Sequence, residues 1–139
     1  MNFFEQELRK LADQCGALAD PRYIGRACYG RVSGGIRAKL QFVTMGTHER
    51  YEALKVTLIN NTDGVIDSNT IRFKDIWGTQ KGTNYAGDIS PQMWTYNGKT
   101  EWYGFVPGPA DYELLAGSVD EHLEMFREDI EQHNGQTMA

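Results

Sequence analysis

Apolar residues recur at helical spacing at both ends of the chain. Near the N-terminus, intervals of four, three, four and three residues join Phe4, Leu8, Leu11, Cys15 and Leu18. Such intervals put residues on one side of a helix, so the pattern predicts a helix over residues 2–19 that ends at Asp20-Pro21. Near the C-terminus a similar stripe predicts an amphipathic helix over residues 109–132; its members are Tyr112, Leu115, Val119, Leu123, Phe126 and Ile130.

Between the two helices, apolar and polar residues alternate, which is the period of a half-buried strand. The alternation predicts four strands, over residues 24–32, 36–42, 51–60 and 65–76. Gly34-Gly35 predicts the turn of the first hairpin, because glycine adopts the backbone angles of tight turns at low cost.

A second hairpin is predicted around Asn97-Gly98, the residue pair that best fits a two-residue hairpin turn. This turn would pair Trp94 with Glu101 and Met93 with Trp102. The elements together predict one α+β domain over residues 1–139, with an N-terminal helix, an antiparallel sheet of about six strands and a C-terminal amphipathic helix. Residues 78–91 are expected to form a long loop and residues 133–139 a frayed tail.

Charge is distributed unevenly along the chain. The net charge is -5, yet residues 21–82 hold ten Lys and Arg against five Asp and Glu, and residues 109–139 hold eight acids and one Arg. The start of the chain lacks the basic and apolar segments of a signal peptide, no stretch is long enough to span a membrane, and the two cysteines do not form a disulfide framework. We therefore expect a cytoplasmic protein that does not bind membranes.

The basic region predicts a charged sheet face. Alternation puts one aromatic and six cationic residues on the same side: Tyr29, Arg31, Arg37, Lys39, Lys55, Arg72 and Lys74. Cations with an aromatic among them can hold phosphates and stack on a base, so these are candidate nucleic-acid-binding residues. Two other interpretations stay open: a solvated face, or a face that the acidic helix covers.

Protein-binding candidates come from two further regions. The predicted C-terminal helix carries Glu121, Glu124 and Glu128 on its polar side, and such a surface can imitate a phosphate backbone. In the second hairpin, Trp94, Tyr96 and Tyr103 are expected to share one face, and aromatic patches are typical of protein interfaces. Both sets are also compatible with ordinary structural roles, as solvated helix surface and as residues covered by the 78–91 loop.

Catalytic and cofactor motifs give no comparable signal. His48-Glu49 lacks the second histidine of a zinc-protease motif, and Ser33-Gly34-Gly35 lacks the glycine that precedes a nucleophilic serine. Cys28 is interpreted as a buried structural thiol, since only Arg26 is close enough in sequence to activate it. We expect no metal, no cofactor and no catalytic residue, and a small enzyme with a loop-built site is the least favoured function.

Four segments resemble a known family: GRACYGR at 25–31, YEALKVT at 51–57, IRFKDIWG at 71–78 and WTYNGKTEWY at 94–103. They are similar to small uncharacterised proteins carried by conjugative and phage-like mobile elements of gut bacteria. The resemblance implies a bacterial cytoplasm and an accessory or anti-defence role, and it implies no activity and no site residues. The leading hypothesis is a non-enzymatic binding or regulatory protein of a mobile element, such as a nuclease inhibitor that acts by protein-protein contact. The alternative is a nucleic-acid-binding protein.

Overall fold

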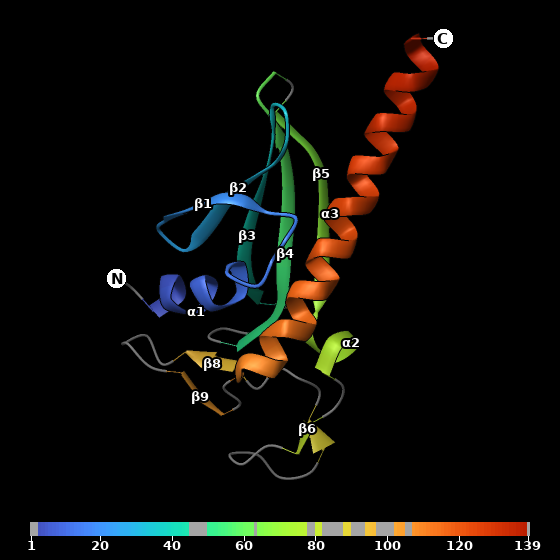
Figure 1. The fold of residues 1–139 in the computed structure, drawn as a ribbon. Helices are drawn as coiled ribbons and strands as arrows, with labels where there is room; N and C mark the ends of the chain where they lie inside the picture. The colour runs from blue at the N-terminus through green and yellow to red at the C-terminus, as the bar shows by residue number, and fades with distance from the viewer. Residues whose placement is uncertain are drawn as a thin grey trace.

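The structure is a computed structural model that describes residues 3–44, 50–62, 64–77, 80–81, 88–89, 94–96, 102–104 and 107–138. Five antiparallel strands form the body of its sheet (Figure 1). Their bounds are β1 Ala19–Ile24, β2 Ala27–Ser33, β3 Ile36–Thr44, β4 Arg50–Asn60 and β5 Gly64–Arg72. An N-terminal helix, α1 Phe3–Ala12, and a C-terminal helix, α3 Pro109–Met138, complete the α+β fold that the sequence predicts, with five main strands rather than six.

Four shorter strands accompany the main sheet. β8 (Trp94–Tyr96) pairs with the start of β4, and β9 (Trp102–Gly104) pairs with β8. β6 (Gln80–Lys81) and β7 (Asp88–Ile89) form a separate two-stranded sheet within the segment expected to be a loop. The rest of the 78–91 segment lies outside the described residues.

One face of the sheet forms the core with both long helices. On β3, Ala38, Leu40 and Phe42 are buried, and the residues between them are exposed or half-buried. Leu8 and Leu11 of α1 belong to the same buried cluster as Tyr112, Leu115, Val119 and Leu123 of α3. Figure 1 shows α1 and α3 on the same side of the sheet, so these elements form two layers, and none of the described helices lies on the opposite sheet face.

The first helix is shorter than predicted. α1 ends at Ala12, although Cys15 and Leu18 are buried as their spacing requires. Beyond Ala12 the chain continues in tight turns, and the carboxylate of Asp120 on α3 accepts the N–H groups of Gly16 at 2.9 Å and Ala17 at 3.0 Å. These bonds replace helical partners, so contact with α3 ends the helix early and leaves room for β1.

The predicted strand over residues 24–32 is two strands. Gly25 has a φ of 62°, a left-handed conformation that glycine adopts without strain, and the chain turns there. Ile24 then pairs with Ala27, and β1 forms the edge of the sheet beside β2. The turn at Gly34-Gly35 is confirmed by the pairing of Ser33 with Ile36.

The predicted fourth strand also ends early. The chain leaves the sheet after Arg72 and forms a short helix, α2 Phe73–Trp77. Burial explains the change: Phe73 and Trp77 stack with ring centroids 4.7 Å apart, and the Trp77 indole N–H donates to the Asp111 carbonyl at 2.9 Å. In a continued strand the two residues would share a face but lie about 13 Å apart, too far to stack, whereas the helix brings them within about 6 Å along its axis.

The second hairpin exists, but its predicted register is wrong. Trp94 pairs with Gly104, Thr95 with Tyr103, and Tyr96 with Trp102, which shifts the pairing by three residues. Five residues, 97–101, therefore separate the two strands, and the Asn97-Gly98 pair lies outside the described residues. At the C-terminus the backbone stays helical to Met138, beyond the predicted end near residue 132.

Candidate nucleic-acid interface

The sheet face opposite the helices, which we call the outer face, is built by strand register. Tyr29 on β2 pairs with Lys39 on β3, and Lys39 pairs with Thr57 on β4. The next row joins Arg31 to Arg37. Directly paired residues lie on the same side of a sheet, so four of the predicted residues are neighbours there.

Two more cations extend this surface across the sheet. Lys55 pairs with Gln41 on one side and Thr70 on the other, and Arg72 of β5 pairs with Ala53. The same register that aligns Tyr29, Lys39 and Thr57 places both residues on the outer face. Lys74 does not: it lies on α2, so its predicted place in the set is wrong.

Arg22 is a member of the outer face that sequence reasoning missed. It lies on β1 and pairs with Tyr29, directly after the bulge between Ala19 and Arg22 in the β1–β2 register. The sequence signal for it was the turn-forming Gly25, because a hairpin turn there brings the residues before it alongside β2. The strand predicted to begin at residue 24 concealed this pairing.

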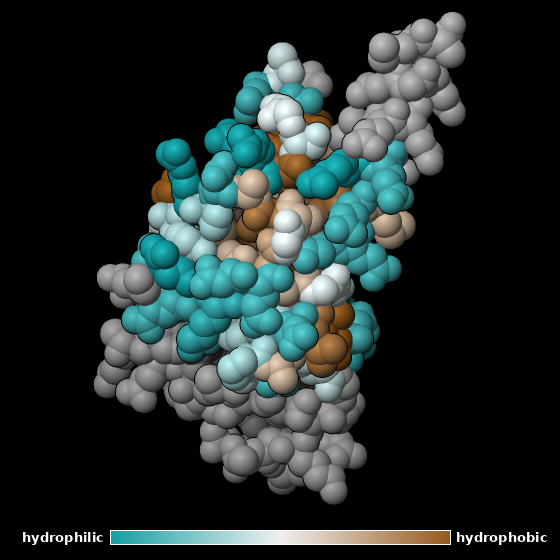
Figure 2. All heavy atoms as spheres, in the orientation of Figure 1, coloured by the Kyte–Doolittle hydropathy of each residue, from teal (hydrophilic) through white to brown (hydrophobic). Residues whose placement is uncertain are grey.

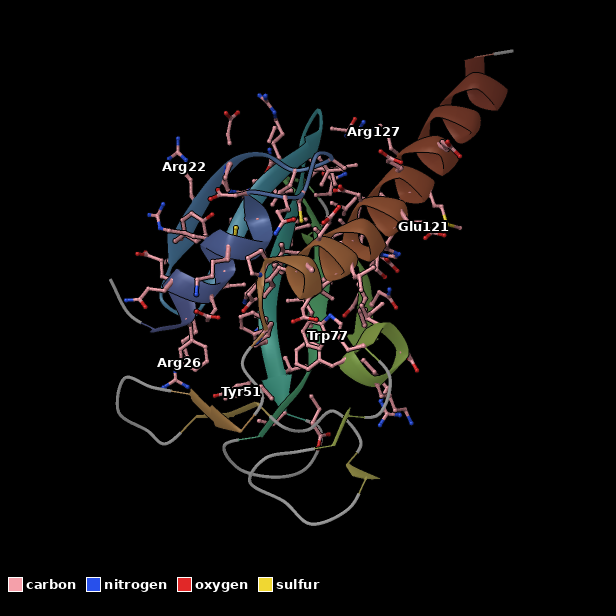
Figure 3. The ribbon with its side chains drawn as sticks, turned by 60° about the horizontal axis from the view of Figure 1, so that its bottom comes forward. Arg22, Arg26, Tyr51, Trp77, Glu121 and Arg127 are labelled. Atoms are coloured by element: carbon pink, nitrogen blue, oxygen red, sulfur yellow. The ribbon has the colours of Figure 1, made fainter. Side chains whose placement is uncertain are left out.

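The acidic helix does not cover the outer face. α3 lies on the core face, where Asp120 bonds the turn after α1, and Glu121, Glu124 and Glu128 are exposed. Figure 3 shows Arg22 pointing away from the body on the β1 side and Glu121 pointing away on the α3 side. The surface on the helix side is mostly hydrophilic along α1 and α3 (Figure 2). The cationic and acidic surfaces are therefore separate.

Contacts within the outer face are few and solvent-accessible. The Arg31 guanidinium lies 3.1 Å from the Asp20 carboxylate, and both side chains are more than half exposed. The Lys39 amino group lies 5.8 Å from the centroid of the half-buried Tyr29 ring. Exposed ion pairs of this kind contribute roughly 0–1 kcal/mol, so the cations are available to a ligand at small cost.

The exposed side of α3 also carries apolar residues. Leu114 and Met125 are 59% and 58% exposed, and they share a helical stripe with Glu121 and Glu128. This stripe contains two of the three acidic candidates, with Glu124 beside it. It is a second surface, on the side of the molecule remote from the outer face.

The aromatic candidates are not brought together as predicted. The observed register sets Tyr103 opposite Thr95, whereas Trp94 and Tyr96 take alternate positions on β8. Tyr103 thus belongs to a different set of register positions from the other two. The side chains of Trp94, Tyr96 and Tyr103 lie outside those that the structure describes.

Both cysteines are buried. Burial raises the pKa of the Cys28 thiol to about 11 and that of the Cys15 thiol to about 12. A thiolate is the reactive form, so neither residue is an activated nucleophile at neutral pH. Within the described residues, no three His, Cys, Asp or Glu side chains are grouped closely enough to hold a metal ion.

Comparison with protein-family models, curated proteins and solved structures finds no match to this chain. Among the described helices, none combines the length and the apolar character that crossing a membrane requires. The outer face is therefore interpreted from its own residues.

Proposed function

We propose that this protein is a non-enzymatic binding protein that holds single-stranded nucleic acid on the outer face of its sheet. One observation carries the proposal: the register aligns Arg31, Arg37 and Lys39 beside Tyr29 on the sheet face opposite α1 and α3. Six cations lie on this face when Arg22, Lys55 and Arg72 are included. Phosphate contacts by such cations supply most of the affinity of sequence-independent binding.

The arrangement favours a single strand over a duplex. Neighbouring strands of a sheet lie about 4.8 Å apart, so the cations from β1 to β5 span roughly 19 Å across the sheet. Tyr29 lies within this row of cations, and its ring is half-buried and partly accessible. An aromatic side chain stacks on a base only when that base is unpaired, and each such stack contributes about 1–3 kcal/mol.

The test measures binding of a fluorescently labelled oligonucleotide by anisotropy across a salt series. Single-strand binding that releases one counterion per contact gives a slope of about −0.7 per cation in a plot of log K against log salt. With six cations engaged we expect a slope of about −4. Absence of binding at low salt would overturn the proposal.

Two matched variants localise the binding. Lys39→Gln removes a cation from the outer face and should reduce the slope by about 0.7. Lys74→Gln removes the same charge from α2, outside the face, and should leave the slope unchanged. Equal effects of the two variants would show that net charge, rather than this face, determines binding.

A second candidate function rests on the exposed stripe of α3. Leu114 and Met125 lie next to Glu121, Glu124 and Glu128, a combination of apolar and acidic groups that fits a protein with a basic, nucleic-acid-binding groove. The family resemblance implies an anti-defence role, and a mobile-element protein that inhibits a host nuclease is one version of that role that would use such a surface. We expect wild type to bind and inhibit a nuclease. The triple variant with Gln at residues 121, 124 and 128 should lose this binding.

A further inference from the structure

The outer face has a hollow at its β1 edge. It is a shallow pocket of about 250 Å³, lined by Asp20, Arg22, Tyr29, Gly30, Arg31 and Arg37. The residues come from three adjacent strands, and the strand register fixes their positions. The backbone around the pocket is therefore held by strand pairing, unlike that of a group of cations on loops.

The charges around the pocket do not balance. Three guanidinium groups face one carboxylate, which leaves a formal charge of +2. Arg31 and Arg37 are directly paired across β2 and β3, an arrangement in which like charges repel each other. An anion seated between the two guanidinium groups would remove this repulsion.

Asp20 occupies an unusual position beside these arginines. Its φ is 51°, a left-handed conformation that costs free energy in residues other than glycine, and it lies in the bulge between Ala19 and Arg22. The bulge sets its carboxylate 3.1 Å from the Arg31 guanidinium. Asp20 is thus a built-in anion that neutralises one arginine and that an incoming ligand must displace or tolerate.

We propose that this pocket binds a terminal phosphomonoester of a nucleic-acid strand, with Tyr29 stacked on the terminal base. The inference rests on the proposed function and names the part of the strand that the β1 edge recognises. A phosphomonoester carries a charge of about −1.5 to −2 at pH 7, which matches the excess positive charge of the pocket. An internal phosphodiester carries only one negative charge. Guanidinium groups bind phosphate oxygens in a bidentate manner, so Arg22, Arg31 and Arg37 can surround the three terminal oxygens.

The experiment compares one oligonucleotide in three forms: with a 5′-phosphate, with a 3′-phosphate and with hydroxyls at both ends. All are measured by anisotropy at one fixed salt concentration. We expect one phosphorylated form to bind about tenfold tighter than the hydroxyl form, equivalent to about 1.4 kcal/mol. The preference should grow between pH 5 and pH 7, because the second ionisation of a phosphomonoester has a pKa near 6.

Variants separate the pocket from the rest of the face. Arg31→Gln should abolish the preference for the phosphorylated end, whereas Lys55→Gln should weaken all three forms equally because Lys55 does not line the pocket. Asp20→Asn should increase the preference, since it removes the competing charge while asparagine still tolerates a positive φ. Circular dichroism of each variant checks that the fold is intact.

The outcomes distinguish this inference from the proposed function. Equal affinity for the three forms, with steep salt dependence retained, overturns the terminal-phosphate pocket and leaves the nucleic-acid interface standing. No binding of any form overturns the interface itself. Inorganic phosphate, added at matched ionic strength, should remove the preference for the phosphorylated end; persistence of the preference would overturn recognition of the phosphate group by this pocket.

Discussion

The two faces of the sheet are built from alternate residues of the same strands, yet they have opposite character. On β3, Ala38 and Leu40 are fully buried against the helices, whereas Arg37 is exposed and Lys39 is half-buried on the outer face. The strand period of two separates them, because adjacent side chains point to opposite sides. One set of strands thus provides a stable core on one face and a charged surface on the other, so stability and binding can be altered independently by neighbouring substitutions.

The largest expected effect comes from the core face. Leu40→Ala removes a fully buried side chain in the middle of β3, and such truncations cost about 2–5 kcal/mol of unfolding free energy. Chemical denaturation measures the loss. The matched control is Gln41→Ala on the adjacent outer position, for which we expect a change within about 0.5 kcal/mol. Similar losses for the two variants would contradict the division of the sheet into two faces.

A buried polar contact between the two helices gives the next largest effect. The Tyr112 hydroxyl of α3 donates to the Glu7 carboxylate of α1 at 2.7 Å, and the Lys10 amino group lies 2.9 Å from the same carboxylate. Tyr112→Phe deprives a buried acceptor of its partner, so we expect a loss of about 1–3 kcal/mol. Arg9→Gln is the control, because it breaks the ion pair with Glu5 at 3.7 Å and the contact of the guanidinium with the Tyr23 ring at 4.3 Å, and it should cost at most about 1 kcal/mol.

This contact also predicts a loss of stability at alkaline pH. Burial, reinforced by the neighbouring Glu7 carboxylate, raises the pKa of Tyr112 above its ordinary value of 10. The folded protein therefore keeps this proton where the unfolded chain releases it, so the stabilisation is complete below pH 10 and falls as the pH rises above 10. Urea unfolding at pH 9 and pH 11 should show that the free energy of unfolding declines less for Tyr112→Phe than for wild type. An equal decline would show that other groups cause the loss of stability.

The acids of α3 provide a comparison within one helix. Asp120 points toward the α1 turn and accepts two backbone N–H groups, whereas the adjacent Glu121 is exposed and points away from the body (Figure 3). Asp120→Ala should cost about 1–2 kcal/mol, comparable with the loss of a helix cap, and Glu121→Ala should change stability by less than about 0.5 kcal/mol. Thermal unfolding monitored by circular dichroism measures both, and equal effects would contradict the bracing role of Asp120.

The contact between Asp120 and the turn after α1 shows what the sequence could and could not predict. Apolar spacing correctly identified buried residues of both helices, such as Leu8 and Leu115, because side-chain periodicity is a local property of each element. The early end of α1 depends on a carboxylate more than one hundred residues away, which no local pattern reveals. The turn at Gly25 is a different case, because this glycine is a local turn signal that was included in a continuous strand.

The candidate site was predicted to a similar extent. Alternation correctly grouped Arg31, Arg37 and Lys39 with Tyr29, and the register of β2 and β3, which shifts between Arg31 and Ser33 beside the turn, pairs these residues directly. Lys74 was assigned wrongly because burial of Phe73 and Trp77 converts the strand into α2. Arg22 and the pocket beside it depend on the β1 bulge, and a bulge leaves no clear signal in the alternation of residues.

Substitution of Arg37 should have the smallest effect on stability and a clear effect on binding. Arg37→Gln replaces an exposed side chain that pairs directly with Arg31, so its removal relieves repulsion and should change unfolding free energy by at most about 0.5 kcal/mol. The same substitution removes one of the six cations and should reduce the salt slope of single-strand binding by about 0.7. Urea unfolding and anisotropy on one preparation measure the two quantities together. A stable variant with an unchanged salt slope would show that the outer face, although open and cationic, is only a solvated surface.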